Sequence, residues 1–548
     1  MPDLLPLPLS VEHRTGCFVL TADIAVVAPA LLADPVALLD EALWRAGRIR
    51  LVRIPEVAAG KSVIEFRVDS TLDDEEYSLQ INTDGVRVVA GGVLGAHWAV
   101  QTLLQLLPPA VYRRSAITAA SWSWPSLHIH DRPLYGWRGF MLDTARHFFP
   151  VHEVLRLIDL LSMHRLNVLH LHLTDDQGWR VQIHRYPRLT EVGAWRSGSM
   201  LGSGADAPVD NTPHGGYYTQ DDVREIVAYA HARGIQVIPE IELPGHVQAA
   251  LAAYPSLGVS EAPTEPWTRW GVNARCLNVE ETTVEFMCAV LDEIMEIFPS
   301  ELIGIGGDEC RKDEWRSDPR TQERMKQLGV RDEKELQSWF IGRINAHVRS
   351  RGRRVFGWDE ILEGGLCEDA VVASWRGAAG ALLAANARHD VVMCPEDVVY
   401  FDYRQSSSPF EPIPTGVVTT VADVRAFTPI PEGLASNKHT HVLGGQANLW
   451  TEHVDSSRRL DYQVFPRLCA LAEALWSGVE EQAVDSFPER LRGHLTRLEA
   501  AGVEYRRSDG PLPWQRRPGI SGKTYERTER AEQIADLTAD LGGRPPES

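Results

Sequence analysis

The pattern of apolar and polar positions changes character near residue 130. Before that point, EEYSLQI (75–81) alternates, NTDG (82–85) contains an Asp-Gly turn, and the apolar run VRVVA (86–90) follows. This order predicts a β-hairpin. Residues 95–107 have the apolar spacing of an amphipathic helix. Together these elements predict a small α+β domain over residues 1–130.

From Tyr135 onward, short apolar runs alternate with longer helical stretches such as 151–165, 221–233 and a last helix near 461–477. Such alternation is typical of βα units with a parallel sheet. Eight strands are predicted, at 137–143, 167–174, 235–242, 302–307, 354–358, 370–375, 390–401 (broken) and 441–449. Eight repeats predict a (β/α)8 TIM barrel, an α/β fold, over residues 131–506.

The last segment, residues 507–548, is polar and charged and has no clear periodicity. We therefore expect a C-terminal polar tail that is partly disordered. No run of about 18 apolar residues occurs, so no membrane-spanning helix is expected. The N-terminal MPDLLPLPLSVEH lacks a basic segment followed by an apolar run. It therefore predicts no signal peptide and a cytoplasmic location.

Composition narrows the classes of partner. The formal charge of −20 disfavours nucleic acid and anionic membranes and agrees better with a neutral substrate such as a sugar. The seven cysteines are scattered and include no CxxC pair, which argues against a disulfide framework or a zinc ribbon. The oligomeric state is left open.

Polar and aromatic side chains gather at the predicted strand ends. In a barrel the carboxyl ends of the strands form one rim, where active sites are built. We therefore expect side chains hundreds of positions apart to converge on one pocket. Those at or just after strand ends are Asp175, Glu242, His246, Asp308, Glu309, Trp358, Trp375, Tyr400, Asp402, Trp450 and Glu452.

GIGGDEC (304–310) is the most informative single motif. Asp308 and Glu309 are adjacent, so both can reach a pocket only where the strand gives way to a loop, and the two preceding glycines permit such a turn. Two neighbouring carboxyl groups do not ionise with equal ease, which predicts one proton-bearing acid and one anionic stabiliser. The alternative is a helix N-cap followed by a solvated glutamate.

Tryptophan gives a second signal. Trp358, Trp375 and Trp450 end the motifs FGWDE, ASWRG and ANLWTE. Sugar faces stack on aromatic rings, and an acetamide methyl group needs an apolar enclosure. A single tryptophan in a barrel is usually part of the core, but three at corresponding strand ends favour a sugar pocket.

Two polar residues allow functional and structural interpretations alike. Arg138 on the first barrel strand could pair with Asp175 at the end of the second and hold its guanidinium toward vicinal hydroxyls, or it could form a structural ion pair. Glu452 could accept hydrogen bonds from sugar hydroxyls or face solvent.

A rival class of enzyme is suggested by VLHLHL (168–173), in which His170 and His172 face the same side. An HxH on a barrel strand can bind a metal in amidohydrolase-like enzymes. Such a site needs further histidines on later strands, where this chain has tryptophans instead. Satisfied core histidines are the favoured interpretation, and no metal or cofactor is expected.

With these motifs in place, the chain resembles the family-20 glycoside hydrolases, the β-N-acetylhexosaminidases. The resemblance runs from about Tyr135 to Arg506, and residues 92–107 resemble the small domain that precedes the family's barrel. The matching segments are YGWRGFMLDTARHFFP (135–150), NVLHLHLTDDQGWR (167–180), IPEIELPGH (238–246), GIGGDE (304–309), FGWDE (356–360), SWRG (374–377), GGQANLWTE (444–452) and FPRLCALAEALWS (465–477).

The resemblance implies a role for each matching residue. Glu309 would act as general acid and then as base, Asp308 would hold the acetamido N–H, and Tyr400 would bind the acetamide oxygen. The remaining implied contacts come from residues that wall the pocket, fix sugar hydroxyls or support the acid pair, namely Trp358, Trp375, Trp450, Arg138, Asp175, Glu452, Asp402 and His246. Substrate-assisted catalysis is likewise inherited from the family, which is an exception to the two-carboxylate scheme.

The expected activity is exo-acting, retaining removal of terminal N-acetylhexosamine from oligosaccharides or glycoconjugates. A metal-dependent barrel hydrolase and a non-catalytic sugar-binding barrel are the alternatives. One position departs from a common family pattern: members often carry Asp where Glu242 stands, and some carry Glu. The natural glycan, its linkage and the preference between GlcNAc and GalNAc are left open.

Overall fold

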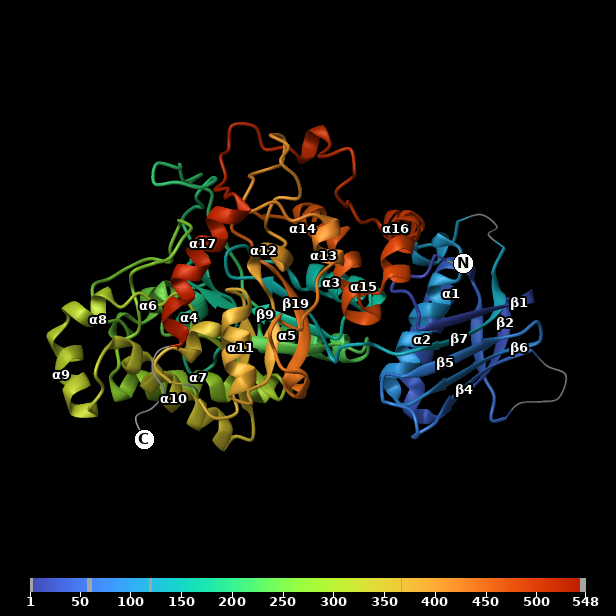
Figure 1. The fold of residues 1–548 in the computed structure, drawn as a ribbon, viewed down its shortest axis with the longest axis horizontal. Coiled ribbons are helices and arrows are strands. Elements are labelled where there is room, and N and C mark those ends of the chain that lie inside the picture. Colours follow the sequence, from blue (N-terminus) through green and yellow to red (C-terminus); the bar gives the residue numbers. More distant parts are fainter. Residues whose placement is uncertain (1–2, 57–61, 118–120, 366, 543–548) are drawn as a thin grey trace.

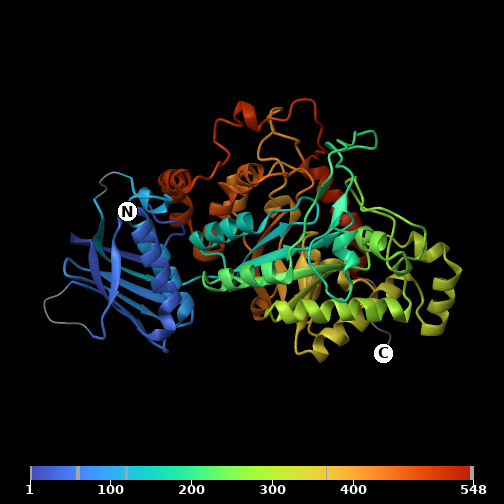
Figure 2. The ribbon, with the colours of Figure 1, turned by 180° about the vertical axis from the view of Figure 1, so that it is seen from behind.

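The computed structural model describes residues 3–56, 62–117, 121–365 and 367–542. It has two parts that lie side by side (Figures 1 and 2): an N-terminal sheet covered by helices, and a larger barrel. The predicted fold class, a TIM barrel preceded by a small α+β domain, is confirmed.

Eight parallel strands close the barrel in the order β14-β15-β16-β17-β18-β19-β8-β9. Closure is made by the last strand on the first, with Gly444 opposite Trp137 and Leu449 opposite Leu142. The strands are β8 (Trp137–Asp143), β9 (Val168–His172), β14 (Gln236–Leu243), β15 (Leu302–Gly306), β16 (Arg354–Trp358), β17 (Val371–Ser374), β18 (Val391–Met393) and β19 (Val442–Leu449).

Two predicted barrel elements are wrong in extent. The broken strand at 390–401 is only the three-residue β18, followed by the short helix α12 (Glu396–Val399). The helix predicted near 461–477 is two helices, α14 (Ser457–Val464) and α15 (Arg467–Ser477), which meet at Phe465 and Pro466. Proline lacks the N–H that a continuous helix would require at this point.

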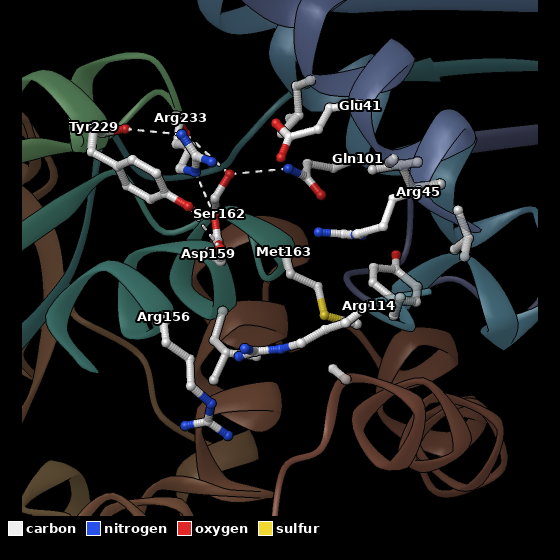
Figure 3. Close-up of a pocket in the computed structure, with 17 residues that line it drawn as sticks. Glu41, Arg45, Gln101, Arg114, Arg156, Asp159, Ser162, Met163, Tyr229 and Arg233 are labelled. Atoms are coloured by element: carbon white, nitrogen blue, oxygen red, sulfur yellow. Dashed lines mark hydrogen bonds and ion pairs between the residues drawn. The ribbon is translucent and has the colours of Figure 1, made fainter. Parts of the chain in front are cut away.

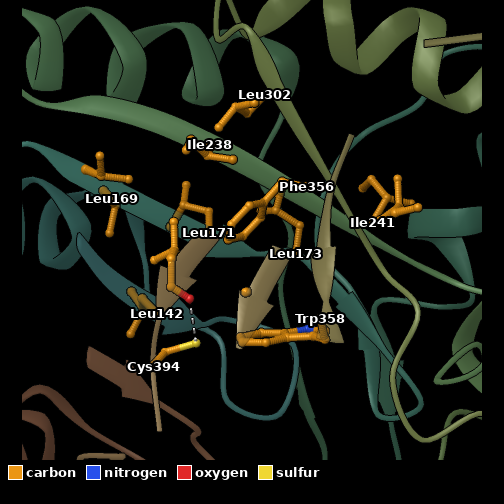
Figure 4. Close-up of a cluster of buried hydrophobic side chains, with 14 of the residues drawn as sticks. Leu142, Leu169, Leu171, Leu173, Ile238, Ile241, Leu302, Phe356, Trp358 and Cys394 are labelled. Atoms are coloured by element: carbon orange, nitrogen blue, oxygen red, sulfur yellow. Dashed lines mark hydrogen bonds between the residues drawn. The ribbon is translucent and has the colours of Figure 1, made fainter. Parts of the chain in front are cut away.

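The barrel strands are buried on both faces, as parallel strands covered by helices must be. Alternating leucines of β9, Leu169 and Leu171, pack with Ile238 of β14 and Leu142 of β8 in one cluster (Figure 4). Outside the strands, α3 (Val151–Met163) and α5 (Gln220–His231) pack against each other. Thr219 starts α5 with a capping box formed with Asp222.

The N-terminal domain is a seven-stranded sheet in the order β1-β7-β5-β6-β4-β2-β3. The predicted hairpin is confirmed as β5 (Tyr77–Ile81) and β6 (Gly85–Ala90), which pair antiparallel. The helices α1 (Ala33–Gly47) and α2 (Val93–Gln105) pack together. The other strands are β1 (Ser10–Val19), β2 (Asp23–Val27), β3 (Arg50–Arg53), β4 (Val63–Val68) and β7 (Ser123–Asp131).

A buried polar network joins the two parts. The carboxylate of Asp131, at the end of β7, accepts hydrogen bonds from Tyr77 Oη at 2.8 Å, Arg165 Nη1 at 2.6 Å and Trp476 Nε1 at 2.9 Å. Beside this interface lies a cavity of about 150 Å³ between α1 and α3 (Figure 3). Gln101 and Ser162 meet across it through a 3.0 Å hydrogen bond.

The C-terminal tail is more ordered than predicted. Residues 507–542 include the helix α17 (Arg527–Thr538), which lies across the barrel in Figure 1. Thr524 forms a β-bridge with Gly416, and the Arg530 guanidinium binds the buried Glu396 carboxylate with an Nη2–Oε2 distance of 2.9 Å. Gly416 and Glu396 lie in the segment after β18, far from the tail in sequence. The order of the tail therefore depends on contacts that its own pattern of apolar and polar residues does not reveal. Residues 543–548 lie outside the described residues.

Among the described residues, no helix is both long and apolar enough to cross a membrane.

Candidate active site

The strand β15 ends in a turn that presents two acids. Gly306 and Gly307 have φ values of 66° and 92°, and Glu309 itself is left-handed at 44°. A Cβ atom on Gly306 would lie 1.8 Å from Oε2 of Glu242, so only glycine fits there. The turn leaves Asp308 almost buried, at 8% exposure, and the Glu309 side chain 40% exposed.

His246 lies between two pairs of carboxylates. Its Nε2 atom is 3.6 Å from Oδ2 of Asp308 and 3.7 Å from Oε2 of Glu309. Its Nδ1 atom is 3.4 Å from Oδ1 of Asp175 and 3.3 Å from Oδ2 of Asp176. The structure therefore brings together four sequence-predicted residues from three strand ends.

Burial and neighbouring charges separate the two acids. Burial raises the pKa of Asp308 to about 6, and the adjacent Glu309 charge adds to this. Burial also opposes ionisation of Glu309, but the His246 contact and the more distant Arg146 outweigh it and lower its pKa. His246 is itself cationic, because Asp175 and Asp176 raise its pKa well above the usual value in spite of burial. In the free protein the proton of the pair therefore favours Asp308.

Arg146 places its guanidinium among the predicted site residues Asp175 and Trp450. It follows β8, and its Nη2 atom lies 2.8 Å from Oδ2 of Asp175, while Nη1 lies 3.2 Å from Oδ2 of Asp143. The guanidinium also sits 4.9 Å from the ring centre of Trp450. Arg146 thus supplies a fixed cation at the carboxyl end of the barrel, beside predicted substrate-binding residues.

The predicted role of Arg138 in binding substrate is wrong. Arg138 is the second residue of β8, at the amino end of the barrel, and is 1% exposed. Its guanidinium binds Glu75 of the N-terminal domain and the carbonyl oxygens of Tyr135 and Arg165. The structural ion pair left open by the sequence is therefore the correct alternative, with Glu75 and not Asp175 as the partner.

Four aromatic side chains from successive strand ends form a continuous wall. The ring centres of Trp375 and Tyr400 are 6.3 Å apart with nearly parallel planes, and Tyr400 and Trp450 are also 6.3 Å apart. Trp358 lies 5.7 Å from Trp450. Burial raises the pKa of Tyr400 well above its usual value, so its phenol remains a hydrogen-bond donor.

Asp402 and Glu452 each follow a residue of this wall by two positions, Tyr400 and Trp450 respectively. Burial raises the pKa of both carboxyl groups, and the nearby Glu452 raises that of Asp402 further, whereas Arg146 opposes the shift at Glu452. Oδ1 of Asp402 is buried and has no hydrogen-bond partner within the described part of the chain. These two acids offer oxygen atoms to groups that enter the pocket.

Behind the pocket, His170 and His172 share one buried carboxylate. Oε2 of Glu240 lies 3.1 Å from His170 Nε2 and 2.6 Å from His172 Nδ1. Glu240 and Asp175 raise the pKa of His172 to about 10 although burial opposes the charge. Each histidine of the HxH motif therefore has a protein partner.

Glu242 is 1% exposed, and neither of its carboxylate oxygens has a hydrogen-bond partner among the residues described. Burial and the nearby charges of Asp308 and Glu240 raise the pKa of Glu242 well above the usual value. The side chain is therefore a neutral acid that packs beneath the Gly306 turn.

Among the described residues, donor atoms of four groups lie close enough to hold a metal ion, one of them apart from the acid pair at His164, Cys469 and His494. The other three are His172, Glu240 and Glu242; Asp175, Asp176 and His246; and His246, Asp308 and Glu309. Apart from Glu242, the members of the first two of these three groups already bind one another or Arg146, and the third contains the acid pair. To bind a metal, these side chains would have to give up their present hydrogen bonds and ion pairs within the protein.

Sequence reasoning missed Arg146, Asp176 and Glu240. Arg146 lies three residues past the end of β8, where the rule used for the other strand ends applies equally. Asp176 directly follows Asp175, so it also lies just after a strand end and could have been identified in the same way. Glu240 faces the barrel interior beside His170 and His172, and an acid within an otherwise apolar strand was a further available signal.

Comparison with known proteins agrees with this geometry. Residues 135–479 match the catalytic domain of glycosyl hydrolase family 20, and residues 1–132 match domain 2 of that family. The chain is 39% identical over 537 residues to a beta-hexosaminidase of Porphyromonas gingivalis, covering 97% of this chain and 67% of the relative. It is 33% identical to a beta-N-acetylhexosaminidase of Cellulomonas fimi, covering 93% and 97%.

Solved structures give the same result. An exo beta-N-acetylglucosaminidase from Vibrio harveyi superposes with a TM-score of 0.79 at 34% identity, covering 92% of this chain and 78% of that one. A beta-N-acetylhexosaminidase from Streptomyces coelicolor superposes with a TM-score of 0.79 at 31% identity, covering 94% and 99%. The chain therefore belongs to glycosyl hydrolase family 20.

Proposed function

We propose that this glycoside hydrolase is an exo-acting, retaining β-N-acetylhexosaminidase that uses the substrate's acetamido group as its nucleophile. The observation that carries the proposal is the placement of Asp308 and Glu309 around one nitrogen atom of His246, at 3.6 Å and 3.7 Å. In a retaining enzyme with its own nucleophile, two carboxyl groups flank the scissile bond about 5–5.5 Å apart. Here the two acids are adjacent on one turn, with carboxylate oxygens within 4.8 Å of each other, and family 20 is a substrate-assisted exception to the scheme with an enzyme nucleophile, so the proposed nucleophile is the acetamido group.

The two acids then divide the work. Glu309, the more exposed, protonates the departing oxygen and later activates water, while Asp308 accepts the acetamido N–H. The buried Oδ1 atom of Asp308, which has no hydrogen-bond partner in the described chain, supports this role. A donated N–H favours the charged form of Asp308 and so moves the shared proton toward Glu309, where the acid step needs it.

The aromatic wall and the polar edge account for recognition. Trp358, Trp375 and Trp450 enclose the sugar and the acetamide methyl group, and the Tyr400 hydroxyl donates to the acetamide oxygen. Hydroxyls of the terminal sugar bind a polar group made of Arg146, Asp175, Asp402 and Glu452. The partners are therefore oligosaccharides or glycoconjugates that end in N-acetylhexosamine.

The test is a panel of aryl β-glycosides that differ only at C2 and C4. Cleavage of N-acetylglucosaminides and not of plain β-glucosides is expected, and a thiazoline mimic of the cyclised intermediate should inhibit tightly. Comparable rates on both glycosides would refute the acetamide as nucleophile. Binding of N-acetylglucosamine without turnover of any glycoside would instead support a sugar-binding barrel.

A further inference from the structure

Two histidines and a cysteine meet away from the acid pair, where three helices come together (Figure 1). His164 follows α3, Cys469 lies on α15 and His494 lies on α16 (Glu481–Ala501). All three side chains are fully buried. Nε2 of His164 lies 3.0 Å from Nε2 of His494 and 3.3 Å from Sγ of Cys469. The three donor atoms lie within 4.8 Å of one another, so a single ion could contact all of them.

The backbone fixes the tautomer of His164. Its Nδ1 atom lies 2.6 Å from the carbonyl oxygen of Leu160, and a carbonyl group only accepts hydrogen bonds, so Nδ1 carries the proton. Nε2 therefore presents a lone pair to the cluster. A histidine that binds a metal through one ring nitrogen usually donates from the other to a carbonyl or carboxylate oxygen, and His164 is arranged in this way.

Hydrogen bonds within the protein do not fully account for this cluster. The lone pair on Nε2 of His164 can accept one strong hydrogen bond, but the Cys469 thiol and Nε2 of His494 both lie within reach of it. The other ring nitrogen of His494, Nδ1, is buried and has no hydrogen-bond partner among the described residues. No described residue therefore fixes the proton on one nitrogen of His494, and its Nε2 atom is free to act as a ligand.

The protonation states of the three side chains also suit a cation. Burial lowers the pKa of His164 to about 4 and that of His494 well below its usual value, so both imidazoles are neutral near neutral pH. Burial raises the pKa of the Cys469 thiol, which therefore keeps its proton until a bound metal ion displaces it. The cluster carries no positive charge of its own that would repel a cation.

The spacing of the donor atoms agrees with a small transition-metal ion. Zinc binds histidine nitrogen at about 2.0–2.1 Å and thiolate sulfur at about 2.3 Å. With tetrahedral angles, two nitrogen ligands are then about 3.3 Å apart, and a nitrogen and a sulfur are about 3.6 Å apart. The corresponding distances in the protein are 3.0 Å and 3.3 Å, so each pair needs to separate by only about 0.3 Å.

We propose that His164, Cys469 and His494 form a binding site for one transition-metal ion that thiolate and imidazole ligands select, namely copper(I) or zinc. Magnesium and calcium prefer oxygen ligands and do not fit this donor set. Copper(I) with one thiolate gives a neutral cluster, whereas zinc leaves one positive charge, which burial disfavours. His164 precedes β9 and lies at the amino end of the barrel, so the ion stabilises the packing of three helices and does not take part in the reaction.

The experiment uses the full chain without an affinity tag, produced in separate cultures that are supplemented with copper, zinc or cobalt, because a fully buried site is filled during folding. Loosely bound ions are removed with a chelator, and the metal content is measured by elemental mass spectrometry. The parent should carry about one copper or zinc ion per chain, and Cys469→Ser and His494→Gln should carry at least about tenfold less. Cys394→Ser, at a buried cysteine elsewhere in the barrel, is the matched control and should carry as much as the parent.

Cobalt gives a second readout that reports the thiolate directly. A cobalt–thiolate bond produces a charge-transfer band in the near ultraviolet, which should appear in the parent and in Cys394→Ser and be absent from Cys469→Ser. The melting temperature of the parent should rise with its metal content, whereas that of Cys469→Ser should be the same from every culture. Circular dichroism checks that the variants are folded, and either Cys469→Ser or His494→Gln alone is enough for the comparison.

Two results would overturn the proposal. One is a parent that carries none of the three metals after the chelator step. The other is a metal content that stays at the level of the parent in both Cys469→Ser and His494→Gln, because the ion would then be bound elsewhere. None of these measurements depends on turnover, so the proposed function and the metal site can fail independently.

Discussion

Nε2 of His246 lies 3.7 Å from Oε2 of Glu309, and this cation lowers the pKa of the proposed general acid. An acid must be protonated to act, so removal of the cation raises the pKa of Glu309 and extends activity to higher pH. We expect His246→Gln to move the alkaline limb of kcat/KM upward while its maximum falls, because Glu309 is less well oriented.

The measurement is the pH profile for N,N′-diacetylchitobiose between about pH 4 and about pH 9. His152→Gln, at an exposed histidine of α3, is the matched control and should leave the profile unchanged. An alkaline limb that moves to lower pH in His246→Gln would contradict the assigned electrostatics.

The two acids should respond differently to the leaving group. Glu309→Gln should lose about 10²–10⁴-fold on N,N′-diacetylchitobiose and much less on a nitrophenyl glycoside, because a nitrophenolate leaves without protonation. Asp308→Asn should impair both substrates by similar factors, since its contact is with the acetamido group. Comparison of kcat/KM for both variants on both substrates tests the assignment, and the reverse pattern would exchange the two roles.

Two arginines, Arg138 of the first barrel strand and Arg146 of the loop after it, should differ in their effect on the reaction. Arg146→Met should lower kcat/KM by at least about 100-fold, because the sugar loses a charged partner, and should also lower the free energy of unfolding by about 3 kcal/mol, since the buried Asp143 and Asp175 lose their cation. Arg138→Met should leave KM unchanged and lower the free energy of unfolding by about 3 kcal/mol, since Glu75 and two carbonyl groups lose their donor. A raised KM in Arg138→Met would instead indicate that Arg138 contributes to substrate binding.

Glu242 should tolerate amide replacement. Burial holds the pKa of its folded state far above that of the unfolded chain, so the folded state binds one more proton between the two values. Stability of the native protein is therefore lost as pH rises through that window, and Glu242→Gln removes the loss.

We expect Glu242→Gln and Glu242→Asp to keep most of the activity, and the melting temperature of the Gln variant to exceed that of the parent by more at about pH 8 than at about pH 5. Differential scanning calorimetry at the two values checks this. A destabilised Gln variant at the higher pH would mean that Glu242 is ionised in the folded protein.

Removal of divalent metals should leave turnover unchanged. Two of the acids that could hold a metal already have close protein partners, with Arg146 at 2.8 Å from Asp175 and His172 at 2.6 Å from Glu240. Dialysis against a chelator, followed by assay with and without added zinc, distinguishes the two hydrolase classes. Loss of activity that zinc restores would support the metal-dependent alternative.

The barrel was predictable because each strand is encoded locally, as one apolar run between helices. Seven of the eight strands lie within one or two residues of their predicted bounds. The site was largely predictable for the same reason, since strand ends converge by topology. Arg138 shows the limit of that reasoning. It was placed by its motif, although its position near the start of β8 puts it at the opposite end of the barrel from Asp175.

Other features depended on contacts that no local pattern contains. The Asp131 network joins residues 345 positions apart, at Trp476. The order of the tail likewise comes from partners in loops after β18. Sequence periodicity reports the face that a segment buries, but it does not identify the segment on the other side.

The docking of α17 has a consequence for biosynthesis. Translation starts at the N-terminus of a protein. The Glu396 carboxylate, which is 4% exposed in the finished fold, therefore has no Arg530 to bind until that residue, 134 positions further along the chain, has been made. Glu396 also accepts a hydrogen bond from Tyr403, three residues after Tyr400. The loop that carries Tyr400 therefore reaches its final form only after Arg530 has left the ribosome, whatever the progress of the barrel before it.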